Sequence, residues 1–530
     1  MNTIETLNIA KSLQRWAKER PNSIAILEMR SGQKKTFKEL EQESNRLASG
    51  LIQYGMKPYE RVLLMIPYGI DFITLTFAMF KADLIPVLID PGLGKKNVLK
   101  CIQEVHPQGL IAIPIVHAIK KIFPSPFKSI KHNVTVGKRW FWRGTTLDNL
   151  RDLGKIDFKL APTEKQNPAA ILFTSGSTGH PKAAVRTHGF LLAQYRVLEK
   201  NIKLVPGEID LTTLPIFSLA NLASGVTSVI PDADMRRPGT VNPVPVLRQI
   251  RECRVNRCAA SPAFFDCLLQ GDDGSLAHLR KILTGGAPVF PRLLNALQGA
   301  APDAMVEAVY GSTEAEPIAH LSASDCSSTD HAMMAEGKGL LGGYPVPEID
   351  LRIITAQWGE SIPPLQREAF QAMQLGPYQA GEIVVSGPHV LPGYLHGRGD
   401  DETKFRVDKQ IWHRTGDAGY QDQSGRIWLL GRCIARIDDT KGIVWPFAVE
   451  CAAMALDGVR RAALISARGE RILIIEAQRT VDTGLLIENL KQYLHWAKLD
   501  HIRSVGLLPV DARHNAKIDY PALRQMLESN

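Results

Sequence analysis

The chain has 530 residues, of which 45% are hydrophobic and 22% are charged, and this balance is typical of a folded globular protein and excludes a disordered chain. Its 63 basic and 54 acidic residues give a formal net charge of +9, which suits an anionic small molecule and does not require nucleic acid. Because single hydrophobic cores stop growing at roughly 250–300 residues, we expect at least two domains.

Cysteine usage and the apolar segments indicate a cytoplasmic protein. The seven cysteines are odd in number, scattered and without metal-ligand spacing, so we expect reduced thiols with structural roles. The longest apolar stretch, residues 72–90, is interrupted by Lys81 and Asp83. The first thirty residues carry charges where a signal peptide needs an apolar centre.

The first third of the chain alternates between strand and helix patterns. Apolar residues at helical spacing in 5–21 are followed by a short strand, PNSIAIL, and by the amphipathic helix TFKELEQESNRLASGLIQYG. Thr36 and Glu39 form a capping box at the start of that helix. The strands RVLLMIP and LIPVLID flank another helical stretch, and the rhythm continues through ILFT, DLTTLPI, VNRCAAS and KILTGG. This order predicts parallel sheets covered by helices.

After about residue 345 the pattern changes to strands joined by hairpin-like turns, which predicts a smaller β-rich subdomain. Residues 433–530 then indicate a compact α+β unit, with helices VECAAMAL and LLIENLKQYLHWA and strands RRAALISA and RILIIEAQ. We therefore predict two domains, 1–432 and 433–530. The fold class is α/β, with a β-rich subdomain in the large domain and a small α+β domain at the C-terminus.

A loop rich in hydroxyls and glycines follows the strand AAILF. It reads Thr174, Ser175, Gly176, Ser177, Thr178, Gly179, His180, Pro181 and Lys182. Glycines let a backbone approach phosphate oxygens, hydroxyls donate to them, and a lysine adds a positive charge. The glycine spacing and Ala183 exclude a Walker loop. Taken alone, the same composition is also that of an ordinary linker.

Four further polar clusters follow in order. Thr313 and Glu314 come after Tyr310-Gly311-Ser312, and the Glu314 carboxylate could hold Mg²⁺ against phosphates or be simply solvated. Asp417 ends a strand, where it could accept ribose hydroxyls or be a turn residue. Arg432 closes the next strand as a ligand contact or a surface arginine, and Lys517 lies on a turn near the C-terminus.

Together and in this order, the clusters resemble the ANL superfamily of adenylate-forming enzymes. The resemblance runs through TFKELEQESNRLASGL, FKADLIPVLIDPG, TSGSTGHPK, LTGGAP, YGSTE, RTGD and GR to the C-terminal lysine. It implies a large N-terminal domain and a mobile C-terminal lid domain. It also implies ATP and Mg²⁺ and a small carboxylic acid as substrate, with no role for nucleic acid.

The resemblance also implies a role for each matching residue. The loop 174–182 would bind pyrophosphate, and Thr313 and Glu314 would contact phosphate and Mg²⁺. Asp417 and Arg432 would bind ribose, and Lys517 would bridge the substrate carboxylate and the α-phosphate. The adenine pocket would consist of Gly285, Gly286, Ala287, Pro288, Tyr310 and Gly311.

The chemistry explains why cations are needed. A carboxylate that attacks the α-phosphate brings anions together, at a cost of about 4 kcal/mol per close pair at an effective dielectric near 20.

Another segment, Gly337–Gly342, has the spacing of a dinucleotide loop but precedes a strand pattern, so we reject a nicotinamide or flavin site there.

Departures from the family pattern narrow the substrate. Ser218 stands where amino-acid-activating relatives have an aspartate, which disfavours an amino acid. The position after Gly431-Arg432 that usually carries an Asp or Lys hinge is Ile434, and the arginine that lies along the pantetheine path in CoA ligases is absent.

Three segments are similar to the β-lactone synthetases of bacterial long-chain olefin biosynthesis: RHNAKI, FSLANLASGVTSVIPDADMRRP and VTVGKRW. That branch implies adenylation of a β-hydroxy fatty acid, followed by attack of its own hydroxyl, with no CoA. A fatty acyl-CoA ligase and a non-catalytic nucleotide-binding protein remain alternatives. His188 and His514 are candidates for the base that takes the hydroxyl proton.

The stretch 120–144 is basic and aromatic, KKIFPSPFKSIKHNVTVGKRWFWRG. It could contact a membrane, a partner enzyme or an acyl chain, or form a solvated surface loop. The sequence indicates neither the acyl length nor the oligomeric state.

Overall fold

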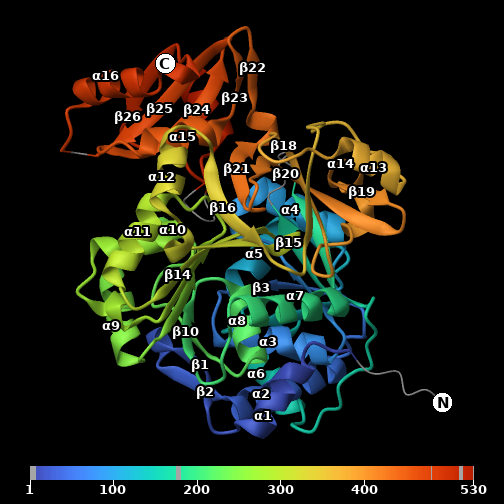
Figure 1. Ribbon diagram of the computed structural model, residues 1–530. Coiled ribbons are helices and arrows are strands. Elements are labelled where there is room, and N and C mark those ends of the chain that lie inside the picture. The colour runs from blue at the N-terminus through green and yellow to red at the C-terminus, as the bar shows by residue number, and fades with distance from the viewer. Residues whose placement is uncertain (1–6, 175–180, 479, 512–516, 529–530) are drawn as a thin grey trace. The chain divides into compact units, whose positions relative to one another are not determined.

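The computed structural model describes residues 7–174, 181–478, 480–511 and 517–528 (Figure 1). The chain divides into two compact units. Unit 1 comprises residues 1–235, 244–259 and 391–400, and unit 2 comprises 236–243, 260–390 and 401–530. The predicted boundary between residues 432 and 433 is not tested by this division and stays a prediction.

Unit 1 contains a seven-stranded sheet, drawn in blue to cyan in Figure 1. Six neighbouring strands are parallel and the seventh is antiparallel, as the strand-helix-strand rhythm predicts. In spatial order they are β7 (Thr145–Thr146), β6 (His132–Thr135), β5 (Gly109–Ala112), β3 (Arg61–Met65), β4 (Ile85–Leu88), β8 (Pro168–Thr174) and β9 (Lys182–Thr187).

A second group of strands in unit 1 is parallel apart from its last member. Their order is β12 (Arg257–Ala260), β10 (Ile209–Thr212), β11 (Thr227–Ile230), β1 (Ile24–Glu28) and β2 (Gln33–Thr36). The helices of this unit are α1 (Lys11–Glu19), α2 (Phe37–Gln53), α3 (Ile70–Lys81), α4 (Lys95–Val105), α5 (Pro114–Ile122), α6 (Leu147–Leu153), α7 (His188–Asn201) and α8 (Pro215–Ala223), with most of α9 (Pro243–Glu252).

Helix α2 begins at the predicted capping box. The Glu39 N–H donates to the Thr36 hydroxyl at 3.2 Å, and the Thr36 N–H donates to the Glu39 carboxylate at 2.7 Å. The reciprocal bonds satisfy two backbone donors that a helix start leaves open. Helix α1 is shorter than the predicted 5–21, because its apolar pattern extends past the hydrogen-bonded turns.

Lys81, which interrupts the longest apolar stretch, is fully buried at the end of α3. Its ammonium lies 2.6 Å from the Glu41 carboxylate and donates also to Ser44 and Asn45. Burial lowers the Lys81 pKa to about 8, against the opposing effect of Glu41. This charge therefore ties α3 to α2 inside the core.

Unit 2 is dominated by antiparallel strands after residue 305, as the hairpin-like turns predict. Strands β13 and β14 are parallel to each other. The strand order is β17 (Asp350–Ile354), β18 (Gly381–Ser386), β20 (Gln410–Gln421), β21 (Ile427–Arg432), β16 (Leu340–Pro345), β15 (Ala315–Ser322), β14 (Met305–Ser312) and β13 (Lys281–Gly285), with β19 (Lys404–Val407) paired to β20. Helices α10 (Pro262–Gln270), α11 (Pro291–Ala300), α12 (Ser328–Ala335), α13 (Arg367–Met373) and α14 (Asp400–Thr403) belong to this part of the chain.

The C-terminal segment has a sheet and core clusters of its own (Figure 1, red). Its strands are β22 (Ile437–Asp439), β23 (Gly442–Val444), β24 (Val459–Ala467), β25 (Glu470–Ala477) and β26 (His501–Val505), with helices α15 (Pro446–Met454), α16 (Thr483–Tyr493) and α17 (Tyr520–Glu528). The predicted fold class, α/β with a β-rich part and a small α+β part, is confirmed. The segment Gly337–Gly342 leads into β16 rather than into a helix.

All seven cysteines are free thiols, as expected. In the part of the chain that the structure describes, no helix combines the length and the apolarity needed to cross a membrane.

Candidate active site

Two predicted turns lie at the carboxyl ends of neighbouring parallel strands. Strand β13 ends at Gly285, opposite Val309 of β14. A Cβ on Gly285 would stand 2.6 Å from the Val309 carbonyl oxygen, and Gly286 has φ +80°, so side chains are excluded from this turn. The carboxyl ends of parallel strands are where open α/β sheets bind ligands.

Tyr310, Asp417 and Arg432 come together in unit 2. The Tyr310 hydroxyl donates to Asp417 Oδ2 at 2.8 Å, and Arg432 Nη1 lies 3.1 Å from Asp417 Oδ1. Arg432 also donates to the Thr415 carbonyl at 2.9 Å. The β20–β21 register explains the meeting, because Asp417 and Arg432 are directly opposite each other. We call these three residues the tyrosine cluster.

The protonation states in the tyrosine cluster follow from its charges. Desolvation raises the Tyr310 pKa, and the neighbouring Asp417 carboxylate raises it further, so Tyr310 remains a phenol that donates. Asp417 raises the Arg432 pKa against desolvation, with smaller contributions from Tyr310 and Glu314. Glu314 is thus within electrostatic range of Arg432.

Thr313 and Glu314 form the turn between β14 and β15. The pairing of these strands shifts register between Tyr310 and Ser312, which is a bulge at Gly311. Bulges re-aim neighbouring side chains and are frequent beside active sites. The Glu314 N–H donates to the Ser312 hydroxyl at 3.2 Å, which fixes the turn.

The glycine-rich loop joins the two strands of a hairpin in unit 1. Thr174 of β8 pairs with Lys182 of β9, and Ser175, Gly176, Ser177, Thr178 and Gly179 lie outside the described residues. The Lys182 side chain is 7% exposed, and its ammonium lies 5.8 Å from the centre of the Tyr394 ring. A Cβ on Gly399 would stand 2.6 Å from Lys182 Cδ, so the segment 391–400 packs tightly on this lysine.

Lys517 is held on a short turn of the C-terminal segment. Its N–H donates to Asp511 Oδ1 at 3.0 Å, and its carbonyl accepts from the Asp511 N–H at 2.8 Å. Lys517 is exposed. His514 and Ala516 lie outside the described residues.

His188, one candidate for the base, is buried at the start of α7. Its Nδ1 accepts from the Ile9 N–H at 3.4 Å, and its ring meets Phe80 edge-on. Burial lowers the His188 pKa to about 4, so the imidazole is neutral. These contacts give it a packing role between α7 and the N-terminal segment.

Ser218 belongs to a buried cluster of hydroxyls that sequence spacing did not reveal. On α8, its Oγ lies 2.8 Å from Ser228 Oγ and is also hydrogen-bonded to the Tyr68 hydroxyl. Burial raises the Tyr68 pKa, so this phenol is neutral. We call Tyr68, Ser218 and Ser228 the hydroxyl cluster. The only sequence signal for it was the serine at position 218.

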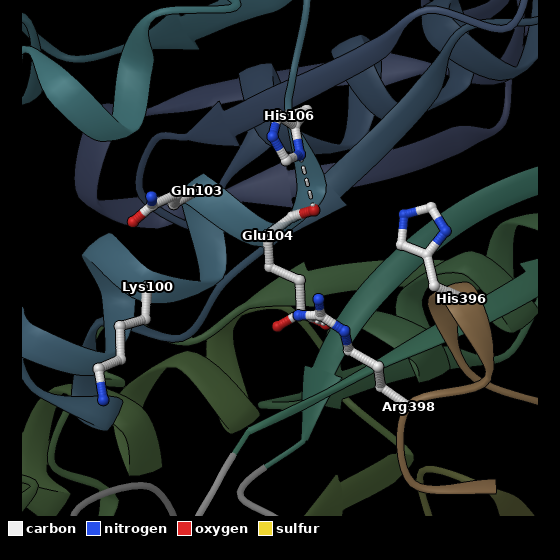
Figure 2. A pocket seen from close by; sticks show the side chains of 6 residues that line it. All are labelled: Lys100, Gln103, Glu104, His106, His396 and Arg398. Atoms are coloured by element: carbon white, nitrogen blue, oxygen red, sulfur yellow. Dashed lines mark hydrogen bonds and ion pairs between the residues drawn. The ribbon is translucent and has the colours of Figure 1, made fainter.

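A separate pocket in unit 1 contains none of the predicted residues (Figure 2). Its volume is about 490 Å³, and Arg398 lies 3.8 Å from Glu104 within it. His106 is hydrogen-bonded to the Glu104 carbonyl, as the dashed line shows. The pocket is lined by Lys100, Gln103, Glu104, His106, His396 and Arg398.

Comparison with known proteins agrees with the motif order. Residues 13–395 match the family described as AMP-binding enzyme. The chain belongs to the AMP-binding, adenylate-forming (ANL) enzymes. This enzyme is 34% identical to olefin beta-lactone synthetases of Stenotrophomonas maltophilia and Xanthomonas campestris pv. campestris, over 96% of this chain and 96% of each relative.

The enzyme also shares its fold with solved structures. ATP-bound MatB from Rhodopseudomonas palustris matches it with a TM-score of 0.82 at 20% identity, covering 99% of both chains. The family match and the 34% identical relatives, rather than this shared fold, show the activity class, which is that of an AMP-binding, adenylate-forming ligase acting on a small molecule.

Proposed function

We propose that the enzyme activates a β-hydroxy fatty acid as its acyl-adenylate and closes it to a β-lactone. The observation that carries this proposal is the 34% identity, over nearly the whole chain, to two olefin beta-lactone synthetases. In the first step the carboxylate attacks the α-phosphate of ATP and pyrophosphate leaves. In the second, the β-hydroxyl oxygen bonds to the acyl carbon, the bond to AMP breaks, and the hydroxyl proton passes to solvent or a base.

The tyrosine cluster would hold adenosine. A carboxylate has about four acceptor sites; in the described structure one Asp417 oxygen accepts from Tyr310 and the other lies against Arg432. Both oxygens thus keep capacity for a ribose hydroxyl. Arg432 holds one of these oxygens at 3.1 Å, and the turn of Gly285, Gly286, Ala287 and Pro288 would frame the base beside Tyr310 and Gly311.

The phosphates would be bound by the loop 174–182, including Lys182, and by Thr313. Glu314 would supply one carboxylate to Mg²⁺. Among the described residues there is no group of three or more metal-binding side chains. This fits Mg²⁺, which commonly takes one or two protein carboxylates and completes its shell with phosphate oxygens and water.

The departures from CoA ligases support ring closure. Ile434, at the hinge position, is 64% exposed and uncharged. After the next glycine, Gly442, the chain continues with Ile443 and Val444 rather than with the arginine of the CoA ligases, and Val444 is buried in the C-terminal core. An intramolecular hydroxyl needs no second binding site, and holding both reacting groups in one molecule can be worth several kcal/mol.

The hydroxyl cluster supports a fatty acid over an amino acid. A substrate ammonium requires a carboxylate partner, and the hydroxyl cluster supplies none. Asp210, the carboxylate whose charge reaches Tyr68, is fully buried and already lies against Asn221 and Arg257.

Product analysis by mass spectrometry tests the proposal. The enzyme is incubated with ATP, Mg²⁺ and a long-chain β-hydroxy acid, with and without CoA. We expect a CoA-independent product lighter than the substrate by one water, together with AMP and pyrophosphate. A product formed only with CoA would make the enzyme a fatty acyl-CoA ligase, and no product with either would favour a non-catalytic nucleotide-binding protein.

Lys517→Ala tests the adenylation step. Loss of one charge-stabilising group typically lowers kcat by about 10²–10³-fold, so we expect ATP–pyrophosphate exchange to fall by that factor while nucleotide binding is kept. Lys491→Ala, an exposed lysine of α16, is the matched control. Unchanged exchange in Lys517→Ala would refute the role of this lysine.

A further inference from the structure

One segment of the chain holds most of its net positive charge. Residues 105–147 contain seven lysines and arginines and no aspartate or glutamate, so they carry +7 of the formal +9. They form α5, β6 and the connection to β7, at one edge of the seven-stranded sheet. The charge is therefore concentrated on one edge of unit 1.

The same edge exposes aromatic side chains on a fixed frame. Trp142 is buried, stacks on His117 of α5 at 5.2 Å between ring centres, and donates to the Thr135 hydroxyl at 2.9 Å. Its neighbours Trp140 and Phe141 are 52% and 76% exposed, with ring centres 5.3 and 5.4 Å from that of Trp142. The anchored Trp142 thus presents two large apolar rings to solvent.

Helix α5, which leads from β5 to β6, exposes two further apolar side chains. Ile115 and Ile122 are 55% and 68% exposed, and residues seven apart lie on one face of a helix. His117, between them in sequence, holds this helix against Trp142. Trp140 and Phe141, which are adjacent, exposed and both packed on Trp142, form the apolar centre of the surface, whereas singly exposed apolar residues are common elsewhere.

Cations surround the exposed rings. Lys138, Arg139 and Arg143 flank Trp140 and Phe141 in sequence and are exposed, as is Lys121 of α5. Arg139 is hydrogen-bonded to the Gly144 carbonyl, which closes the loop that carries the rings. Tryptophan and phenylalanine beside lysine and arginine match the two layers of a membrane surface, where rings enter the headgroup region and cations meet anionic lipids.

We propose that residues 114–144 form a peripheral docking surface for an anionic lipid bilayer. Trp140, Phe141, Ile115 and Ile122 insert at the headgroup level, and Lys121, Lys138, Arg139 and Arg143 bind the lipid phosphates. A protein partner would have to match the same +7 charge and also cover two protruding rings. The bilayer offers both features over its whole area without a shaped pocket.

Vesicle cosedimentation of the full chain tests this surface. Vesicles of phosphatidylcholine mixed with phosphatidylglycerol are compared with vesicles of phosphatidylcholine alone. We expect binding to the mixed vesicles that weakens with salt, and a loss of about tenfold or more in the partition coefficient for Trp140→Ala/Phe141→Ala. Lys138→Gln/Arg143→Gln should lose about tenfold or more on the mixed vesicles.

Matched controls distinguish binding through this surface from nonspecific binding to vesicles. Tyr344→Ala/Leu485→Ala removes exposed apolar groups elsewhere, and Lys34→Gln/Lys409→Gln removes exposed charges elsewhere. Both should bind vesicles like the wild type, and all four double variants should keep ATP–pyrophosphate exchange, which shows that they fold. Failure of the wild-type protein to bind the mixed vesicles would overturn the proposal. So would a self-association that Trp140→Ala/Phe141→Ala abolishes while vesicle binding persists.

Discussion

Two carboxylates on neighbouring strands of unit 2 have opposite environments. Asp417 on β20 is a quarter exposed and shares its oxygens between Tyr310 and Arg432. Glu382 on β18 is fully buried and is held at both oxygens by Arg414, 2.8 and 2.7 Å away. Arg414 and Asp417 are only three residues apart in the sequence His413-Arg414-Thr415-Gly416-Asp417. One short motif thus contains a residue that stabilises the sheet and another that remains open to a ligand.

Residues of the same family motif can therefore have different roles, one structural and one in ligand binding. Arg414 also stacks on Trp358, with 5.3 Å from its guanidinium to the ring centre, and is closed to solvent. A charge in such a place contributes to folding through its partner, whereas a partly exposed carboxylate with spare acceptor sites is suited to binding.

Arg414→Met should have the largest effect on stability. It leaves Glu382 as a buried carboxylate without its cation, and breaking such a pair costs about 3–5 kcal/mol. Urea unfolding should show that loss. Glu382→Gln/Arg414→Met, which removes both charges, should recover part of it. If Arg414→Met unfolds like the wild type, the Arg414–Glu382 ion pair does not stabilise the sheet, and the contrast with Asp417 is wrong.

Glu450 is a third kind of carboxylate: like Glu382 it is buried, but its hydrogen-bond partners are neutral. Its Oε1 accepts from the Tyr520 hydroxyl at 2.7 Å and the Leu464 N–H at 2.9 Å. Burial raises the Glu450 pKa from 4.5 to about 7, so the folded state keeps a proton that the unfolded chain has already released. The resulting stability is present in full below pH 4.5 and is lost as the pH rises to about 7.

Glu450→Gln should therefore remove this pH dependence. Between pH 5 and pH 8, the wild type should lose up to about 3 kcal/mol more unfolding free energy than the variant does. The measurement is urea unfolding of both proteins across that range. Parallel pH profiles would show that Glu450 does not titrate in the folded protein.

Sequence patterns could predict much of this arrangement, for identifiable reasons. Strands and turns leave local signals, so the carboxyl ends of β13, β14 and β21 were predictable as places for polar residues. Asp417, which was expected beyond a strand, lies inside β20, because the strand continues past the turn-like Gly416 to Gln421. The meeting of Tyr310 with Asp417, 107 positions apart, follows from strand order, which local periodicity does not encode. The hydroxyl cluster was missed because nothing in the spacing links Tyr68 to Ser218.

Asp417→Ala should weaken nucleotide use with little effect on folding. Hydrogen bonds to a charged group contribute about 1.5–3 kcal/mol each, so loss of even one ribose contact should raise the KM for ATP by about 10–100-fold. Steady-state exchange kinetics give KM, and thermal unfolding gives stability. A large drop in Tm with an unchanged KM would place Asp417 with Glu382 as a structural carboxylate.

Tyr310→Phe should have the smallest effect and separates position from charge. It removes one donor to Asp417 but keeps the aromatic ring, and water can replace the phenol at this partly exposed carboxylate, so the loss should be only about 1 kcal/mol. We expect KM for ATP to rise about fivefold with kcat nearly unchanged, because Arg432 still positions Asp417 through its other oxygen. Tyr344→Phe, an exposed tyrosine of β16, is the control. If Tyr310→Phe raises KM for ATP as much as Asp417→Ala does, the Tyr310 hydroxyl is required to orient the carboxylate. The three residues of the tyrosine cluster would then act as one unit.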